Sequence, residues 1–315
     1  MSCLYVKNII YLSTDLFVYM PKLAIIDYKK DPTLFIAIRT KAAETSQARI
    51  FGMTILDDEL FVASERSSCV EVYNLNSLQF KRSFLIDNLE EPQDIVSCSM
   101  REFLYILDCG GRYAEKTRVM KILRVDANGN FKKILWQGDD WGRLSVTHEF
   151  NVILAVKDKL LEMTSDGQLI REIKLAVTSI WHAVKLTSGY YLVSYGKPGG
   201  LCIVDNEGKM MICHENYYRE LGYTGIVPVK LALDKAGSVF VVDANGGRVF
   251  LLSPTLEFQR EVLSAKHRLQ NPRRILLDES NCRLLVGENA SHGSIGQISV
   301  FDIRVTDISR ERTVQ

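Results

Sequence analysis

Short apolar segments separated by polar turns follow one another along nearly the whole chain, and their order repeats about every 45 residues. Each unit holds an apolar strand, a short turn, a second apolar strand that ends in an acid, and then two further strands. The second strand of the unit occurs at Leu60–Glu65, Phe103–Asp108, Val239–Asp243 and Leu284–Glu288. A four-stranded repeat of this length is typical of a β-propeller, so we predict an all-β fold of four-stranded antiparallel blades.

The number of blades depends on how the first forty residues are used. The repeat divides the chain into units at 4–40, 50–86, 93–136, 143–175, 182–216, 229–263 and 273–304. We favour seven blades, because a six-bladed ring would leave an apolar N-terminal segment with nothing to pack against. The seventh unit shows three strands, so either the tail (306–313) or an N-terminal strand must cover its edge. In the six-bladed alternative, Leu34–Arg39 completes the last blade and the first thirty residues are left over.

The repeat runs nearly end to end without a linker rich in Pro, Ser or Gly, so we predict one domain over 1–315, with a tail (305–315) that is either disordered or part of the last blade. The 39 basic and 38 acidic residues remove any global attraction to nucleic acid or to an anionic membrane. No segment approaches the roughly 18 uncharged apolar residues of a membrane helix. The seven cysteines form no CxxC motif, and we expect a reduced, cytoplasmic protein held together by blade packing.

One unit resembles an NHL repeat. The resemblance rests on Pro228–Leu231, Asp234–Asp243, Asn245 and Arg248–Val249, and the unit from Pro272 is similar but lacks the arginine. The resemblance implies a propeller, and NHL domains occur in ubiquitin ligases of the tripartite-motif type, in RNA-binding proteins and in amidating lyases. This sequence has no RING or B-box ladder of Cys and His, so a ligase activity would have to come from elsewhere.

The acids that end the second strands form one column of candidate residues, namely Glu65, Asp108, Asp243 and Glu288. As a ring of carboxylates they could hold a cation such as Ca²⁺. In the interpretation that we favour, each acid instead accepts backbone N–H bonds of a turn and pairs with an arginine such as Arg248. The fourth and fifth units lack an acid at this position, so we expect no metal and no cofactor.

A second column lies at the start of the first strands, nearest the channel. It contains Gly52, Asp94, Arg143, Ala183, Lys230 and Arg274, with His182 and Arg273 beside it. This mildly positive channel mouth could receive a carboxylate, a phosphate or a nucleic-acid backbone. Alternatively, its charges pair with Asp94, Asp139, Asp140 and the acids of the first column. The loop Gly110–Thr117, which carries Arg112 and Tyr113, is the best recognition candidate on a single blade.

The five histidines fall at different strand positions, and His182 alone is predicted at the channel mouth. A catalytic zinc centre needs three or four converging ligands, so we do not expect a lyase of that type. A calcium-dependent lactonase site built from Glu65, Asp108, Asp243 and Asn245 agrees better with the sequence than a zinc lyase site does.

Three functions therefore stay open. We favour a non-catalytic scaffold that binds a protein or peptide partner over Arg143, His182, Lys230, Arg273 and Arg274, because no convergent catalytic groups are found. A metal-dependent hydrolase or lyase using Ca²⁺ or Zn²⁺ is the first alternative, and an RNA-binding NHL-type module is the second.

Overall fold

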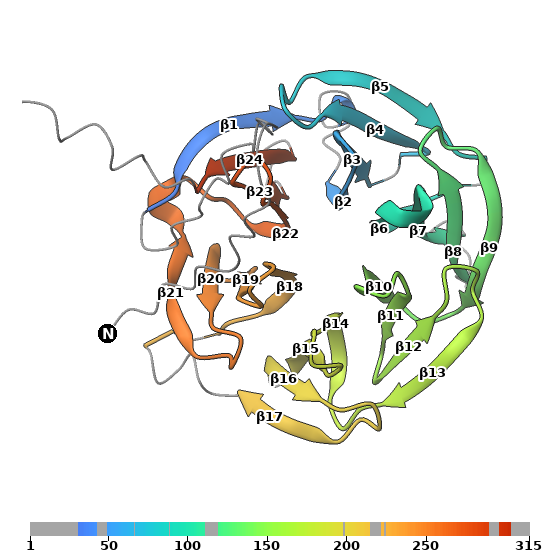
Figure 1. The fold of residues 1–315 in the computed structure, drawn as a ribbon. Coiled ribbons are helices and arrows are strands. Elements are labelled where there is room, and N and C mark those ends of the chain that lie inside the picture. The colour runs from blue at the N-terminus through green and yellow to red at the C-terminus, as the bar shows by residue number, and fades with distance from the viewer. Residues whose placement is uncertain are drawn as a thin grey trace, which may run out of the picture.

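The computed structural model describes residues 31–42, 49–65, 67–87, 89–110, 119–197, 199–214, 222–223, 225–289 and 296–303. These residues form six four-stranded antiparallel sheets arranged around a central axis (Figure 1). The predicted all-β propeller with four-stranded blades is confirmed. The seven blades that we favoured are wrong, because the described strands build six.

Five blades each consist of four consecutive strands. The first contains β2 (Ile50–Leu56), β3 (Glu59–Ser64), β4 (Cys69–Asn74) and β5 (Phe80–Leu85). The second contains β6 (Pro92–Cys98), β7 (Phe103–Gly110), β8 (Val119–Asp126) and β9 (Phe131–Gly138). The third contains β10 (Gly142–Val146), β11 (Val152–Val156), β12 (Lys159–Met163) and β13 (Leu169–Lys174).

The next two blades follow the same plan. The fourth contains β14 (Thr178–Lys185), β15 (Tyr191–Lys197), β16 (Gly200–Val204) and β17 (Met210–His214). The fifth contains β18 (Pro228–Leu233), β19 (Val239–Asp243), β20 (Arg248–Leu252) and β21 (Phe258–Leu263). Two short 3-10 helices, η1 (Ser99–Arg101) and η2 (Ala265–His267), lie in connections. Among the described residues, no helix has the length and apolar character that crossing a membrane requires.

The sixth blade joins the two ends of the described chain. It contains β22 (Pro272–Asp278), β23 (Arg283–Glu288) and β24 (Gln297–Asp302), and its outermost strand is β1 (Thr33–Arg39). β1 runs antiparallel to β24, with Ile38 opposite Ile298, and thereby pairs an edge that a three-stranded sheet would leave open.

This closure explains the error in the blade count. We had placed Leu34–Arg39 in a first blade of its own, whereas its backbone completes the last blade, as the six-bladed alternative required. The part of that first unit before residue 31 lies outside the described residues, and so does the tail. Our argument assumed that an apolar segment must form a blade, and apolar character alone does not specify which strand it pairs with.

The core consists of the interfaces between neighbouring blades. Every residue of β19 is buried, as is every residue of β11, because the second strand of a blade is covered by the blades on both sides. Phe61 of β3, for example, packs toward the second blade, while Val62 packs toward the sixth. This two-sided burial explains the nearly continuous apolar runs of the second strands. The cysteines in the described part of the chain are free thiols, so packing rather than disulfides joins these blades.

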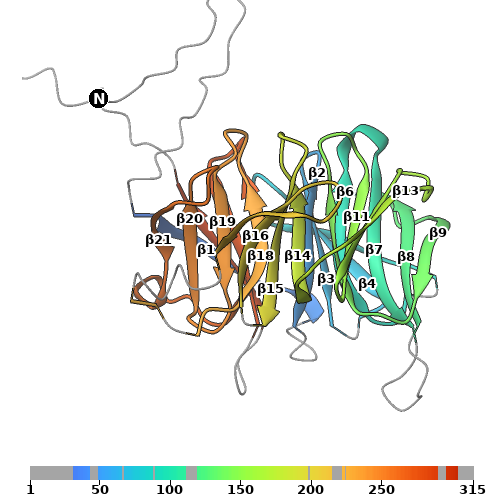
Figure 2. The same ribbon diagram turned by 90° about the horizontal axis from the view of Figure 1, so that it is seen from below.

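The six inner strands are β2, β6, β10, β14, β18 and β22. They surround the axis in Figure 1 and run along it in Figure 2, which views the ring from the side. Each of them except β10 carries a register shift near its start, where one extra residue is inserted opposite the second strand. Such a bulge re-aims the side chains that follow it.

The closure can be tested at Ile38. This side chain is 8% exposed and packs in a cluster with Ile50, Val62 and Ile298, which bridges the sixth and first blades. We expect Ile38→Asp to lower the free energy of unfolding by about 3 kcal/mol, because it removes apolar contacts and buries an unpaired carboxylate. Leu34→Asp on the same strand is the matched control, since Leu34 is 45% exposed, and it should cost less than about 1 kcal/mol. Urea denaturation measures both, and equal losses would contradict the assignment of β1 to the interface.

Candidate functional site

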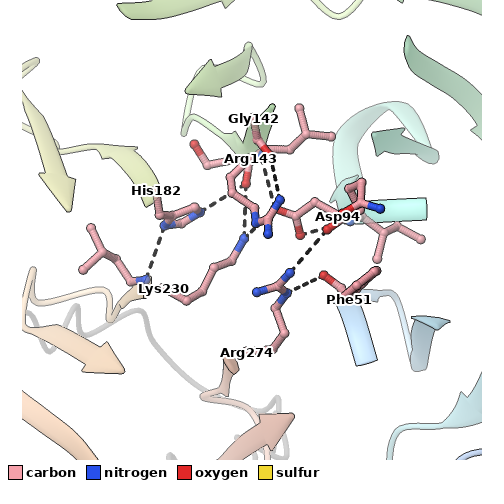
Figure 3. Close-up of polar contacts among 12 residues, drawn as sticks. Phe51, Asp94, Gly142, Arg143, His182, Lys230 and Arg274 are labelled. Carbon is pink, nitrogen blue, oxygen red and sulfur yellow. Dashed lines mark hydrogen bonds and ion pairs between the residues drawn. The ribbon is translucent and has the colours of Figure 1, made fainter. Parts of the chain in front are cut away.

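One residue from each inner strand occupies an equivalent place on the ring. It pairs with a residue in the last part of the second strand, as Asp94 pairs with Leu107 and Lys230 with Val242. By this register the six positions are Gly52, Asp94, Arg143, His182, Lys230 and Arg274. Figure 3 shows the five side chains other than that of Gly52 pointing toward one another, and we call these five residues the channel cluster.

The sequence alignment had placed Ala183 at this position in the fourth blade. The structure places His182 there, because the bulge at Trp181 inserts one residue into β14 before His182 pairs with Ser194. In the other blades with a bulge, the ring residue follows the first paired residue by two positions, as Asp94 follows Pro92. In β14 the pairing begins earlier, at Thr178, so this spacing would not have found His182 from the sequence.

Asp94 is the carboxylate at the centre of the cluster, and it is 1% exposed. Its Oδ2 accepts hydrogen bonds from Lys230 Nζ at 2.9 Å and from the backbone N–H of Leu144 at 3.1 Å, while Oδ1 accepts from its neighbour Ile95. Burial alone would raise its pKa, but the positive charges of Lys230, Arg274 and Arg143 outweigh burial and lower the pKa of Asp94 to about 2. Asp94 is therefore ionised at neutral pH.

Lys230 and Arg274 are buried cations committed to bonds across the ring. Lys230 Nζ also contacts the carbonyl oxygen of Leu144 at 3.4 Å. Arg274 donates to the carbonyl oxygens of Phe51 and of Gln93, the latter at 3.3 Å, and so connects the sixth blade with the first and second. Burial and the neighbouring cations lower the pKa of Lys230 to about 8 and that of Arg274 to about 9, although Asp94 opposes the shift.

Gly52 is the ring position without a side chain. Glycine is needed there because the inner strands β2 and β6 approach each other closely. A Cβ atom on Gly52 would lie 2.5 Å from the backbone nitrogen of Ile95 on β6. No real Cβ makes such a contact, so the first and second blades can pack at this distance only with glycine here. Arg274 reaches past this place to Phe51.

His182 is held at both ring nitrogens by backbone groups. The N–H of Leu231 donates to Nδ1 at 3.3 Å, so the proton is on Nε2, which donates to the carbonyl oxygen of Leu144 at 3.1 Å. Burial, and then the charge of Lys230, keep the pKa of His182 well below its usual value. The imidazole is therefore neutral, and neither nitrogen is available as a general base or a metal ligand.

Arg143 differs from the other cations because it is only half-buried and is anchored to its own neighbour. Its Nη1 donates to the carbonyl oxygen of Gly142 at 2.9 Å. Its remaining N–H groups have no partner among the residues that the structure describes. Burial, and the charge of Arg273 nearby, lower its pKa, while Asp94 raises it.

The channel cluster carries an excess of positive charge. Its three cations face one carboxylate and a neutral histidine, which leaves a formal excess of two charges, whereas the whole chain carries +1. The charge of Asp94 opposes the lowering of the pKa of each of the three cations, because it stabilises their charged forms. The alternative partner Asp140 pairs instead with Lys157 at 2.6 Å. The arrangement can therefore stabilise an anion near the axis.

The acids at the ends of the second strands hold the backbone that leads into the inner strands. Asp108 Oδ1 accepts from the N–H of Glu91 at 2.7 Å, and Asp243 Oδ1 accepts from that of Val227 at 3.0 Å. Glu288 accepts an equivalent bond in the sixth blade. Burial raises the pKa of all three, while these backbone bonds lower it. These bonds come from the segment before each inner strand, whereas we had predicted bonds from the turn after the acid, and Arg248 pairs with Glu261 at 3.8 Å.

The possible metal ligands do not converge. In the first blade the position equivalent to Asp108 is Ser64, because Ser64 pairs with Ile50, and Glu65 one residue later pairs with Arg49 at 3.4 Å. Within the described ranges, no group of three or more His, Cys, Asp and Glu side chains is arranged to hold a metal ion.

The remaining predicted site residues lie at the edge of the cluster or beyond the described chain. Arg273 is the bulge residue of β22, and burial and the charge of Arg49 lower its pKa. Arg112 and Tyr113 lie outside the described residues. The structure thus brings together Arg143, His182, Lys230 and Arg274, with Arg273 beside them.

Comparisons with known proteins show the fold. The sequence matches no protein-family model and no curated protein. The PQQ-bound aldose sugar dehydrogenase from Streptomyces coelicolor is similar in structure, with a TM-score of 0.64 and 10% identity over 88% of this chain and 99% of that one. A catalytically inactive virginiamycin B lyase from Staphylococcus aureus with quinupristin gives 0.59 and 12% identity over 86% and 89%.

The WD40 β-propeller domain of Doa1 gives a TM-score of 0.56 and 12% identity over 86% of this chain and 96% of that one. At these identities the similarity shows the propeller fold alone, which enzymes and other domains share. The NHL-type repeat that we proposed from residues 228–249 stays a prediction, since no family model matches.

The central role of Asp94 gives a stability prediction. Asp94→Asn leaves three cations without a counter-charge, so the free energy of unfolding at pH 7 should fall by about 3 kcal/mol or more. Because the pKa of Asp94 is lowered from 3.8 to about 2, its contribution is complete above pH 4 and is lost as the pH falls toward 2. The difference between wild type and variant should therefore shrink over that range.

The matched control is Glu172→Gln, which removes an exposed ion pair with Lys159 of 3.1 Å and should change stability by less than about 1 kcal/mol. Urea denaturation at a series of pH values measures both variants. An Asp94→Asn protein as stable as wild type at pH 7 would show that the cations do not need this carboxylate.

Proposed function

We propose that this protein is a non-catalytic binding module, which recognises a protein or peptide partner through an anionic group received at the channel cluster. The observation that carries the proposal is Arg143. Among the residues that the structure describes, its half-buried guanidinium is anchored only to the carbonyl oxygen of Gly142, in a cluster with two positive charges in excess. A guanidinium presents parallel N–H donors that match the oxygens of an oxyanion, and such charge-assisted bonds are among the stronger ones in proteins.

The state of the other cluster residues favours recognition over catalysis. His182 has both nitrogens bonded to backbone groups, so it cannot accept a proton without breaking a bond to Leu231. Lys230 is bonded to Asp94, which holds it as a cation. Donors fixed in this way can bind and orient an anion, whereas general acid–base catalysis needs a group that is free to exchange its proton.

A peptide or protein partner is favoured by an aromatic residue two positions before Arg143 in the sequence. Trp141 precedes β10 by one residue and is 43% exposed. Tryptophan and arginine are the residues that most often dominate the energy of protein–protein interfaces. An anionic side chain bound by Arg143 would bring neighbouring residues of the partner close to Trp141. The WD40 domain of Doa1 shares the propeller fold, which is compatible with this proposal.

The test uses the full-length protein and a panel of fluorescent peptides with varied flanks and a central Asp, Glu, phosphoserine or Ser. Peptides with a central anion should bind more tightly than the matched Ser peptides, and added salt should weaken their binding. Arg143→Gln should weaken the binding of these peptides at least about tenfold, since each charge-assisted bond contributes roughly 1.5–3 kcal/mol. Fluorescence polarisation measures the dissociation constants.

Arg101→Gln is the matched control, because Arg101 is exposed in η1, at the opposite end of β6 from Asp94. It removes the same charge and should leave the affinities unchanged. The proposal is overturned if central anions give no advantage over Ser, or if Arg143→Gln and Arg101→Gln have equal effects.

A further inference from the structure

We infer that the anion received by the channel cluster is a phosphoryl group, which carries close to two negative charges, rather than a single carboxylate. This inference rests on the proposed function and names the ligand chemistry of the same site. It follows from three features of the cluster, namely its charge, its uncommitted donors and the way Asp94 is held.

The charge of the cluster matches a dianion. Three cations, one carboxylate and a neutral histidine leave an excess of two positive charges, and Lys230 and Arg274 are among the buried polar residues of the ring. A carboxylate would leave one of these charges unbalanced in a poorly hydrated place, which is unfavourable. A phosphate monoester carries about −1.5 to −2 at pH 7 and would balance the cluster.

The donors that remain also exceed what a carboxylate can accept. Arg143 gives one hydrogen bond, to Gly142, and Lys230 gives two, to Asp94 and Leu144. Arg274 gives single bonds to three carbonyl oxygens. Within the described residues, N–H groups therefore remain on all three cations, which come from three different blades. A phosphoryl group offers three oxygens in different directions, whereas a carboxylate offers two in one plane.

Asp94 orders the cluster without using the donors of Arg143. Its Oδ2 is occupied by Lys230 and the N–H of Leu144, and its Oδ1 by the N–H of Ile95. The Asp94 carboxylate therefore holds the Lys230 ammonium in position. The ammonium and the two backbone N–H groups in turn partly neutralise the negative charge of Asp94. His182 bonds the same Leu144 carbonyl oxygen that Lys230 contacts, so it helps to fix the ammonium from the other side.

Two sources can supply this group, namely free inorganic phosphate and a phosphorylated residue of a peptide. Isothermal titration calorimetry on the full-length protein distinguishes them, with four probes: inorganic phosphate, a phosphoserine peptide from the panel above, and the same peptide with Glu or Ser at that position. We expect the phosphoserine peptide to bind at least about tenfold more tightly than the Glu peptide. Binding of inorganic phosphate as tight as that of the phosphoserine peptide would support the inference with free phosphate as the source, whereas much weaker binding would support it with a phosphorylated partner.

Substitutions at Arg143 test whether this residue binds the phosphoryl group. Arg143→Gln should lose at least tenfold in affinity for the phosphoserine peptide. Arg143→Lys keeps the charge without the planar fork and should lose less, while Arg101→Gln should bind as wild type does. Circular dichroism confirms that each variant is folded before its affinity is compared.

The inference is overturned if the Glu peptide binds as tightly as the phosphoserine peptide in an Arg143-dependent manner, a result that leaves the proposed function intact. If neither anionic peptide depends on Arg143, the proposed function fails as well. The two failures are therefore distinguishable in one set of titrations.

Discussion

The antiparallel pairing of β1 with β24 is the interaction on which the described structure depends. It joins segments separated by more than 250 residues and closes a ring in which each blade packs against two others. Each second strand is covered by the blades on both sides of it, so its apolar run is buried. The closure also sets the geometry of the axis, because six inner strands then face a common centre and each contributes one residue to it.

The bulges near the starts of the inner strands convert this scaffold into a site. One inserted residue turns Asp94, His182, Lys230 and Arg274 toward the axis, and β10 brings Arg143 to the same place without an insertion. The buried acids of the second strands hold the segments that lead into these strands. The two columns of charged residues therefore have different roles, since one supports the backbone and the other presents charge.

The charges at the axis are unequal, and this imbalance distinguishes the cluster from an ordinary buried ion pair. A balanced pair contributes mainly to structure, whereas three cations around one carboxylate repel one another. Their depressed pKa values express that cost, after the larger effect of burial. A bound anion would relieve the repulsion, which is why our proposals centre on the half-buried Arg143 rather than on the committed Lys230.

Local sequence determined the fold class, the second strands and the basic positions at the starts of the inner strands, because alternation, apolar runs and turn residues act over a few residues. It did not determine that Leu34–Arg39 belongs to the last blade, since a strand's own pattern does not specify its partner. Nor did it show that His182, rather than Ala183, faces the axis, because a bulge shifts the register without changing the alternation that follows. The blade count, the membership of the ring and its unbalanced charge were decided by tertiary structure, since each depends on contacts between segments that are far apart in the chain.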